Sequence, residues 1–381
     1  MTHTVTITGY NSAGEGVSRL DDGRVVFIRS AARGDVLEVE LIQEQAKINR
    51  ARIVRILTPS PYRIEPDCSV YPQCGGCDYR HITYEEELSA KLQLVNDALK
   101  RLGGLSIQVD QILHTGQING YRNKAVLHTD GTSSGFYKAR SHDIIPIKHC
   151  LLLKNDLNDA IKNLTQKGTK LKMEKTPDFG QNKINNPLEE ITLRSGLNGT
   201  NHPLEEELDG LIFRLEGFFQ VNTDAAIQLF QKAREYAALT KNDTLIDLYC
   251  GVGALTLFVG RDAGHALGVE LNSDAVKIAR ENAKRNNLSH VGFLSADASD
   301  FIAKITEPDC IIVDPPRKGL SSRAISKILE LAPKRIVYIS CNPATLARDL
   351  KELSSYEVED ICAVDMFPRT ANVECCCLLV R

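Results

Sequence analysis

The pattern of apolar and polar positions divides the chain into three parts. Over residues 1–57, apolar and polar positions alternate in short stretches such as Val36-Leu37-Glu38-Val39, and turns such as Asp22-Gly23 separate these stretches. Alternation with a period of two predicts half-buried strands joined by tight turns. We therefore expect a small OB-like β-barrel over residues 1–57.

From about residue 217 onward, apolar stretches alternate regularly with amphipathic ones. We expect strands at 244–249, 266–270, 290–294, 309–314 and 335–340, interleaved with helices at 223–238, 255–262, 274–287, 321–331 and 344–353. This order predicts a parallel, doubly wound α/β sheet. Two final strands, at about 357–366 and 373–380, have no helix between them, so we expect them to pair antiparallel at the sheet edge.

The part between these two regions has a weaker pattern. It begins with a Pro-containing linker at 58–61, and a helix is expected from Tyr84 through Leu102 before mixed short strands up to about residue 150. The segment 151–210 is polar and rich in asparagine, and its pattern predicts little. We therefore expect three domains, at 1–57, 58–216 and 217–381, of which the second is α+β.

Composition limits the classes of protein that the chain can represent. It has 381 residues, a formal net charge of −3 and 11 cysteines, an odd count that argues against a disulfide framework. The net charge does not indicate a nucleic-acid binder, so any basic surface must be local. No apolar run approaches the roughly 20 residues of a membrane span, and the N-terminus lacks the features of a signal peptide. We expect a cytoplasmic monomer that does not associate with a membrane and has no obligate protein partner. Candidates for a local basic surface are Arg50, Arg52 and Arg55, the stretch Tyr121-Arg122-Asn123-Lys124, and Arg317-Lys318.

Cys341 stands where an apolar strand is expected to end and a helix to begin. Asn342 is a good N-cap and Pro343 a good first helical residue. The thiol would then lie at a helix N-terminus, where unpaired backbone donors and the helix dipole favour the thiolate. Cys341 is therefore a candidate nucleophile, and structural packing is the alternative.

A glycine loop follows the first strand of the expected sheet. Gly251 and Gly253 lie between a strand and a helix, where the backbone can approach a ligand closely. Glu270 ends the second strand, where a carboxylate can hydrogen-bond ribose hydroxyls, and Asp297 follows the third strand, where it could meet an adenine amino group. Position 256 is Thr instead of the third glycine of a dinucleotide-binding motif. This favours S-adenosylmethionine over NAD as the cofactor.

Two further carboxylates occur at strand ends of the same region. Asp314 precedes two prolines that cannot continue a central strand, so it should lie at the rim of the sheet unless the motif only terminates the strand. Glu374 begins an apolar strand, where desolvation would raise its pKa into a useful range for a base. The alternative for Glu374 is an exposed edge charge that deters aggregation. The cysteines at 375–377 are predicted to be apolar packing, because neighbours on a strand face opposite sides.

Three cysteines lie close together in the second part of the chain. Cys68, Cys74 and Cys77 form the pattern C-x5-C-G-G-C, and Cys150 stands 73 positions after the last of them. Three thiolates and a distant fourth are the ligand count of an iron–sulfur cluster or a structural zinc site. Incidental clustering is the alternative.

Together these motifs resemble the S-adenosylmethionine-dependent RNA uracil-5-methyltransferases, which include the ribosomal and transfer RNA 5-methyluridine enzymes. The resemblance covers nearly the whole chain. It implies an N-terminal TRAM domain that binds RNA, a 4Fe-4S cluster and a Rossmann-like methyltransferase domain. At position 372 the chain has Asn where many members have His. By this likeness the cofactor would be contacted by Gln220, Tyr249, Glu270 and Asp314, beside Gly251 and Asp297, and the cluster would be held by Cys68, Cys74, Cys77 and Cys150. RNA would be contacted by Tyr121, Arg122, Asn123 and Lys124. Cys341 would be the nucleophile and Glu374 the base.

The resemblance implies methylation of carbon 5 of a uridine, with 23S ribosomal RNA as the expected substrate. Carbon 5 of uracil is a poor nucleophile, so Cys341 would first add to carbon 6 and Glu374 would later remove the proton from carbon 5. Uridine 54 of transfer RNA and carbon 5 of cytosine are alternative targets. A non-catalytic RNA-binding iron–sulfur protein is an alternative from another class.

Overall fold

The computed structural model describes residues 2–45, 48–130, 133–167, 189–197, 199, 204–214, 217–301 and 307–381. The chain forms two compact units, each with hydrophobic clusters of its own. The first unit comprises Met1–Gly9, Gly14–Thr83 and Gln117–His202, and the second comprises Tyr10–Ala13, Tyr84–Gly116 and Pro203–Arg381.

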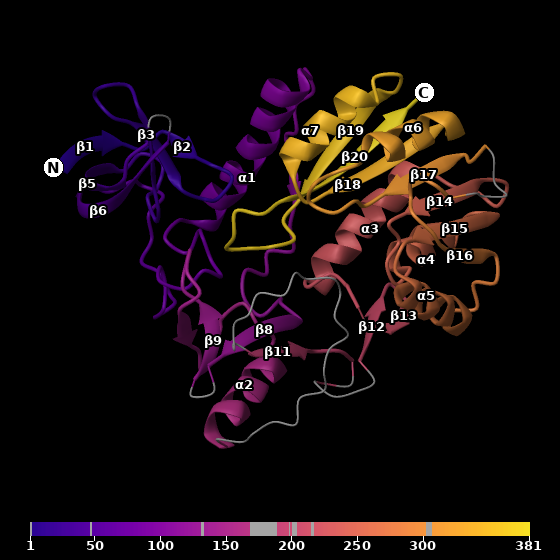
Figure 1. The fold of residues 1–381 in the computed structure, drawn as a ribbon, viewed down its shortest axis with the longest axis horizontal. Helices are drawn as coiled ribbons and strands as arrows, with labels where there is room; N and C mark the ends of the chain where they lie inside the picture. Colours follow the sequence, from indigo (N-terminus) through magenta and orange to yellow (C-terminus); the bar gives the residue numbers. More distant parts are fainter. Residues whose placement is uncertain are drawn as a thin grey trace. The chain divides into compact units, whose positions relative to one another are not determined.

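The second unit is built around an eight-stranded sheet with the order β16-β15-β14-β17-β18-β20-β19-β7 (Figure 1). The strands β14 to β18 pair in parallel, and β20 runs antiparallel to both β18 and β19. The predicted doubly wound α/β sheet is therefore confirmed. The strands are β7 (Ile112–Leu113), β14 (Thr244–Leu248), β15 (His265–Glu270), β16 (Val291–Ser295), β17 (Cys310–Val313), β18 (Arg335–Ser340), β19 (Glu357–Val364) and β20 (Glu374–Val380).

Helices cover both faces of this sheet. One hydrophobic core joins α3, α4 and α5 to one face, and a second core joins α1, α6 and α7 to the other (Figure 1). Along β20, Cys376 belongs to the first core, whereas Cys375 and Cys377 belong to the second. The prediction that these cysteines serve as packing on alternate faces is confirmed. The helices are α1 (Tyr84–Ala98) with a following π-helical turn η1 (Leu99–Gly103), α3 (Thr223–Ala237), α4 (Ala254–Gly260), α5 (Ser273–Arg285), α6 (Ser322–Leu331) and α7 (Pro343–Glu352), and the hairpin β12 (Glu205–Leu208) and β13 (Leu211–Arg214) precedes α3.

The position of β20 within the sheet differs from the expectation. The predicted antiparallel pairing of the last two strands is confirmed, but β20 lies between β18 and β19, and β19 itself pairs in parallel with β7. The predicted edge position is therefore wrong. The two residues of β7 are too few to produce a strand pattern in the sequence, so this cover of the edge could not be foreseen.

The first unit contains two smaller sheets. The N-terminal sheet has the order β1-β5-β6-β4-β3-β2 and encloses an apolar cluster that includes Val26, Ile28 and Leu37. The second sheet has the order β10-β9-β8-β11, and α2 packs against β8 and β11. The elements are β1 (Thr2–Thr6), β2 (Gly9–Tyr10), β3 (Gly16–Arg19), β4 (Val25–Ile28), β5 (Val36–Gln43), β6 (Asn49–Thr58), β8 (Lys124–Thr129), β9 (Ser134–Tyr137), β10 (Ile144–Pro146), α2 (Asn155–Lys167) and β11 (Glu189–Arg194).

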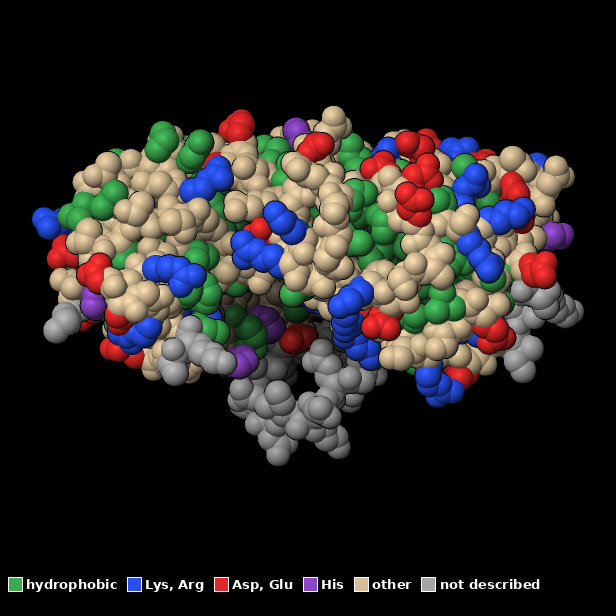
Figure 2. All heavy atoms as spheres, turned by 90° about the horizontal axis from the view of Figure 1, so that it is seen from above, with side chains coloured by type: hydrophobic (Ala, Val, Ile, Leu, Met, Phe, Trp, Pro, Cys, Tyr) green, Lys and Arg blue, Asp and Glu red, His purple; other side chains and the backbone are tan. Residues whose placement is uncertain are grey.

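Charges are mixed over the surface. Figure 2 shows acidic and basic side chains interspersed on the face in view. The three arginines of β6 that were candidates for a basic surface each lie beside a glutamate, in the pairs Arg50–Glu15, Arg52–Glu40 and Arg55–Glu38. Among the described residues, no helix is long and apolar enough to cross a membrane.

Candidate active site

Polar side chains meet at the edge of the eight-stranded sheet that is formed by the carboxyl ends of its parallel strands. The parallel strands β14, β17 and β18 all end there, and they are followed by the loop at 249–253, by Asp314 and by Cys341. Because β20 runs in the opposite direction, it begins at this same edge with Glu374. Ser340 pairs with Cys375, so the residues that follow Ser340 and precede Cys375 lie beside each other.

Cys341 lies between β18 and the start of α7. Asn342 caps the helix by accepting a hydrogen bond from the backbone nitrogen of Ala344 at 3.1 Å, and Pro343 is the first helical residue. The predicted strand end, N-cap and helix start are confirmed. Cys341 itself is half-buried.

The groups around Cys341 act on the ionisation of its thiol in opposite directions. Burial raises the pKa of the Cys341 thiol, the carboxyl groups of Glu374 and Asp314 raise it further, and the charge and a side-chain hydrogen bond of Arg317 lower it. The helix N-terminus was expected to favour the thiolate, and burial and the two carboxyl groups act in the opposite direction. The sequence could not reveal that two carboxyl groups from other strands face the same sulfur.

Glu374 is buried, with 5% of its surface exposed. Burial raises the pKa of Glu374 well above its usual range, Asp314 adds to this rise, and Arg317 opposes it. The expected desolvation of this carboxyl is present, and the alternative of an exposed edge charge is excluded. The raised pKa favours the protonated form of Glu374, whereas only the deprotonated carboxylate can act as a base.

Arg317 is the charged side chain that acts on both of these groups. Its Nη2 donates to Oδ1 of Asn372 at 2.9 Å, and its backbone oxygen accepts a hydrogen bond from Nδ2 of Asn342 at 3.1 Å. Asn372, which lies just before β20, thus holds the guanidinium of Arg317, and Asn342, the N-cap of α7, holds the backbone of Arg317. Sequence reasoning named Arg317 only as a possible surface charge and missed this place beside Cys341.

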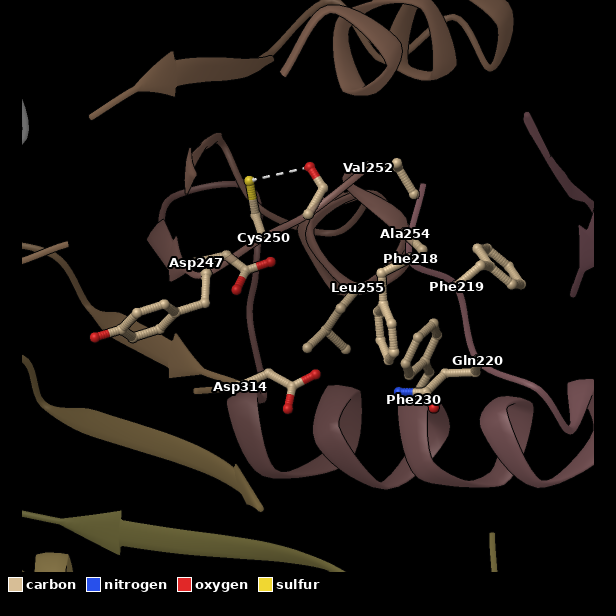
Figure 3. Close-up of a pocket in the computed structure, with 12 residues that line it drawn as sticks. Phe218, Phe219, Gln220, Phe230, Asp247, Cys250, Val252, Ala254, Leu255 and Asp314 are labelled. Carbon is tan, nitrogen blue, oxygen red and sulfur yellow. Dashed lines mark hydrogen bonds between the residues drawn. The ribbon is translucent and has the colours of Figure 1, made fainter. Parts of the chain in front are cut away.

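A pocket opens over the loop that follows β14 (Figure 3). Figure 3 shows the carboxylates of Asp247 and Asp314 facing this space from neighbouring strands, with aromatic rings on the opposite side. Four of the predicted cofactor residues line it, namely Gln220, Tyr249, Gly251 and Asp314. Burial raises the pKa of Asp314 to about 7. The remaining lining residues are Phe218, Phe219, Phe230, Asp247, Cys250, Val252, Ala254 and Leu255.

The other two predicted cofactor residues lie outside the lining of this pocket. Glu270 accepts a hydrogen bond from the backbone nitrogen of Gly251 at 3.1 Å, so it holds the glycine loop. Asp297 is exposed, and its hydrogen bonds from the side chain and backbone of Ser299 lower its pKa. Its charge acts on Tyr249, which places it near the loop.

Asp247 was not recognised from the sequence. It is fully buried in β14, and its Oδ2 accepts a hydrogen bond from Thr256 Oγ1 at 2.6 Å. Its Oδ1 has no hydrogen-bond partner among the described residues, and burial raises the pKa of Asp247 to about 8. A carboxyl in the middle of the apolar strand Leu245–Leu248 is the signal that could have identified it.

The four predicted cluster cysteines gather in the first unit. Cys74 is influenced electrostatically by Cys68 and Cys150, and Cys77 is influenced by Cys74 and Cys150. Arg80 donates from Nε to the sulfur of Cys77 at 3.4 Å. None of these thiols forms a disulfide. However, within the described parts of the chain no group of three or more His, Cys, Asp or Glu side chains has the geometry to hold a metal ion.

The predicted RNA-contacting stretch is only partly accessible. Tyr121 and Asn123 are buried, with 2% and 0% of their surface exposed. Arg122 and Lys124 are half-buried. Burial lowers the pKa of Lys124, and the charges of Arg194 and Arg122 lower it further, so three cations lie near one another. The stretch therefore offers two side chains to a ligand, not four.

The fold and the pocket at the strand ends define a class, the S-adenosylmethionine-dependent methyltransferases. The family model described as "tRNA (Uracil-5-)-methyltransferase" matches residues 210–381, and the TRAM domain model matches residues 1–54. Proteins named "Uncharacterized RNA methyltransferase" from Clostridium tetani and Bacillus cereus are 31% and 33% identical to this chain, over 98% and 97% of it and 95% and 94% of their own lengths. The chain therefore belongs to the RNA methyltransferase family of the tRNA (uracil-5-)-methyltransferase type.

A solved structure supports the fold. The tRNA (uracil-54, C5)-methyltransferase of Pyrococcus abyssi, in complex with S-adenosyl-L-homocysteine, superposes with a TM-score of 0.76. It is 24% identical, and the match covers 99% of this chain and 100% of that one. The expected Rossmann-like domain with an N-terminal TRAM domain is confirmed.

Proposed function

We propose that this enzyme transfers a methyl group from S-adenosylmethionine to carbon 5 of a uridine in RNA through a covalent adduct with Cys341. The observation that carries the proposal is the convergence of Cys341, Glu374 and Arg317 at one edge of the sheet, beside the Asp314 end of the pocket. A thiol and a carboxyl group placed together in this way can act as a nucleophile and a base on one ring.

The reaction requires three roles from the protein. Once its proton has left, Cys341 adds through its sulfur to carbon 6 of uracil, and electron density moves to carbon 5 and the 4-oxygen. Carbon 5 then takes the methyl group that S-adenosylmethionine supplies, and S-adenosylhomocysteine leaves. Glu374 removes the remaining proton from carbon 5, and the electrons of that bond re-form the ring double bond while the carbon–sulfur bond to Cys341 breaks. Arg317 stabilises the thiolate by its positive charge.

The pocket suits a nucleoside cofactor. Its apolar side chains and its carboxylates offer stacking surfaces and hydrogen-bond acceptors, and Gly251 lets the backbone approach. We assign cofactor contacts to Gln220, Tyr249, Gly251 and Asp314. Glu270 and Asp297 act beside them, Glu270 by holding the glycine loop.

We further propose that Cys68, Cys74, Cys77 and Cys150 hold a 4Fe-4S cluster. Four free thiols that influence one another, with the Arg80 guanidinium on one sulfur, fit a negatively charged cluster in their donor chemistry. Four cysteine ligands would leave no open iron position, so the cluster would support the structure. Anaerobically purified protein should show a broad visible iron–sulfur absorption band that is lost in Cys77→Ser, and its absence from the wild type would reject the assignment.

The substrate RNA is the next part of the proposal. We propose 23S ribosomal RNA, with uridine 54 of transfer RNA as the alternative that the substrate named for the Pyrococcus abyssi enzyme supplies. RNA from a strain that lacks the gene would be methylated with labelled S-adenosylmethionine and the labelled nucleotide mapped. Label in transfer RNA alone would overturn the ribosomal assignment, and label on cytosine would overturn uridine as the base.

The covalent step has a direct test. In the presence of S-adenosylmethionine, the wild-type enzyme should form a denaturant-stable complex with RNA that contains 5-fluorouridine, because after methyl transfer the fluorine on carbon 5 cannot leave as a proton does. Cys341→Ala should abolish this complex and methyl transfer while RNA binding is retained. Cys362→Ala, which removes another half-buried thiol, is the matched control. If Cys341→Ala still methylates RNA, the proposed role of Cys341 fails. If the wild type transfers no methyl group, the alternative of a non-catalytic RNA-binding protein is favoured.

For the chain as a whole we propose three domains at 1–57, 58–216 and 217–381, and a cytoplasmic monomer. Limited proteolysis would test the boundaries, and light scattering in solution would test the oligomeric state.

A further inference from the structure

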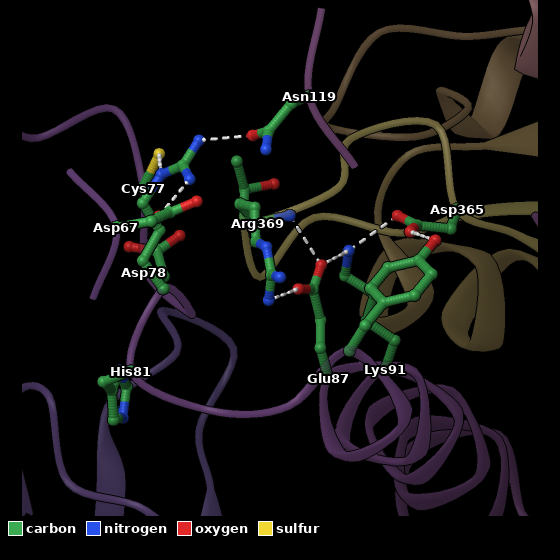
Figure 4. A network of polar contacts seen from close by, with 12 residues as sticks. Asp67, Cys77, Asp78, His81, Glu87, Lys91, Asn119, Asp365 and Arg369 are labelled. Atoms are coloured by element: carbon green, nitrogen blue, oxygen red, sulfur yellow. Dashed lines mark hydrogen bonds and ion pairs between the residues drawn. The ribbon is translucent and has the colours of Figure 1, made fainter. Parts of the chain in front are cut away.

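A buried network of charges ties α1 to the segment between β19 and β20 in the second unit (Figure 4). Lys91 donates from Nζ to Glu87 at 2.7 Å and to Asp365 at 2.6 Å, and all three side chains are fully buried. Glu87 also accepts a hydrogen bond from the backbone nitrogen of Arg369 at 2.7 Å, and Arg369 Nη1 lies 3.5 Å from its other oxygen. The network therefore fixes both side-chain and main-chain atoms of this segment.

Such a network is a poor source of stability. Removing charges from water costs several kcal/mol per ion, and well-packed apolar residues of similar size often replace buried ion pairs without loss. What the network adds is geometry, because the Lys91 Nζ contacts both carboxylates and the backbone oxygen of Phe367 at once. The part of the active site that this geometry can influence is the segment between β19 and β20, which leads to Glu374.

A continuous series of contacts runs from Lys91 to the reactive thiol. Lys91 Nζ donates to the backbone oxygen of Phe367 at 3.1 Å, and the hydroxyl of Thr370 donates to the same oxygen at 2.9 Å. That hydroxyl accepts from the backbone and side-chain nitrogens of Asn372, both at 3.3 Å. Asn372 then holds Arg317 at 2.9 Å, and Arg317 acts on Cys341. We call Lys91, the Phe367 carbonyl, Thr370, Asn372 and Arg317 the relay.

We propose that Lys91 is a positioning residue for the reaction: through the relay it holds the Arg317 guanidinium against the Cys341 sulfur. The inference rests on the proposed function, because it assigns a purpose to a group that acts on the proposed nucleophile. It reaches beyond that function by including α1, which carries no group of the site.

The electrostatics around Cys341 support this assignment. The groups that face the thiol are Glu374 from β20, Asp314 from the end of β17, and Arg317. Among these three charged groups, Arg317 is the one that favours the thiolate. If the guanidinium moves away, burial still opposes ionisation of the thiol, and so does each carboxyl group whenever it carries its negative charge.

The test measures the thiol without RNA or S-adenosylmethionine. Iodoacetamide reacts with the thiolate, so the rate of Cys341 alkylation at pH 8, followed by mass spectrometry of the Cys341 peptide, reports its ionisation. Thr370→Val removes the hydroxyl at the centre of the relay with little change of shape, and Lys91→Met removes the buried charge. We expect Cys341 alkylation to be on the order of fivefold slower in both variants, as in Arg317→Met.

Two control variants separate positioning from general damage. Thr370→Ser keeps the hydroxyl and should restore the wild-type rate. Tyr84→Phe removes a hydrogen bond of 2.6 Å to Asp365 but leaves the relay intact, and it should also react at the wild-type rate. Circular dichroism would verify that each variant is folded, and if Lys91→Met does not fold, Thr370→Val decides.

Wild-type alkylation rates in folded Lys91→Met, in folded Thr370→Val or in Arg317→Met would overturn the inference. Equal slowing in Tyr84→Phe or in Thr370→Ser would also overturn it, since the effect would then not follow the relay. The proposed function fails by a different result, namely methyl transfer by Cys341→Ala.

Discussion

Ser340 of β18 lies opposite Cys375 of β20 in an antiparallel ladder, and this pairing brings the two proposed catalytic side chains together. Cys341 follows the first of these residues, and Glu374 precedes the second. An antiparallel strand inserted into a parallel sheet can present its first residue at the edge where its neighbours end. The base and the nucleophile therefore share one edge although they are 33 residues apart in the sequence.

Replacing Glu374 with Gln should stop the reaction after methyl transfer. The amide cannot take the carbon-5 proton, so the methylated RNA should remain bonded to Cys341, and turnover should fall by roughly 10²- to 10⁴-fold. A denaturing gel of the reaction with unmodified RNA and S-adenosylmethionine would show the adduct. The exposed Glu357→Gln is the control, and turnover within a few-fold of wild type in Glu374→Gln would contradict this role.

The unliganded protein should lose stability as the pH rises from 6.5 to 8.5. The pKa of Asp247 is raised to about 8 in the folded protein, above the ordinary value of an unfolded aspartate near 4. The folded state therefore binds one more proton between these values, and the free energy of unfolding decreases as the pH rises towards about 8 and levels off above it. Asp314, with a pKa of about 7, contributes in the same direction.

Asp247→Asn should flatten this decrease, leaving the part due to Asp314 and Glu374. Thermal unfolding at several pH values would measure it, with the exposed Glu352→Gln as the control. An unchanged slope in Asp247→Asn would mean that this carboxyl does not retain its proton in the folded protein.

Gly319→Ala should destabilise the loop that carries Arg317. Gly319 has a φ of +76°, and an added Cβ would lie 2.5 Å from Oδ2 of Asp349. That carboxylate accepts hydrogen bonds from Leu320 at 2.7 Å and from Tyr338 at 2.6 Å, so it cannot move freely. Gly104→Ala is matched, because Gly104 has a φ of +66° with nothing within 4 Å of the added atom.

In urea unfolding we expect about 1 kcal/mol of loss for Gly104→Ala from the backbone conformation alone. Gly319→Ala should lose at least about 1 kcal/mol more, because hydrogen bonds of the buried carboxylate are strained. Equal losses would show that the loop can shift to admit the methyl group.

Lys124→Gln should weaken RNA binding and lower its dependence on salt. Lys124 lies near Arg122 and Arg194, and a phosphate would offset the mutual repulsion of these cations. The slope of log affinity against log salt should become smaller by about one. The exposed Lys162→Gln of α2 is the control, and an unchanged slope in Lys124→Gln would remove Lys124 from the RNA contacts.

Local sequence patterns predicted much of the fold and several site positions. The cap at Asn342 and the start of α7 at Pro343 depend on neighbouring residues, so the sequence reveals them. The same holds for the alternation of cysteines in β20, which follows from the two-residue period of a strand.

Properties that depend on distant residues could not be predicted. The raised pKa of Cys341 results from burial and from the carboxyl groups of Glu374 and Asp314, which come from other parts of the sheet. The place of β20 between β18 and β19, and the cover of β19 by β7, depend on pairing between segments far apart in the sequence. The role of Arg317 required Asn372, which lies 55 residues further along the chain. These contacts form only when distant segments pack together, so the local pattern of apolar and polar residues does not reveal them.

The consecutive thiols of β20 have a consequence for how this protein would age in an oxidising solution. Cys375, Cys376 and Cys377 are fully enclosed beneath helices on opposite sides of the sheet, and burial raises the pKa of each thiol. Peroxide could reach them only after helices had separated from the sheet. Chemical damage at these sulfurs would thus record how often the interior opens, and it would lag behind the loss of activity caused at the half-buried Cys341.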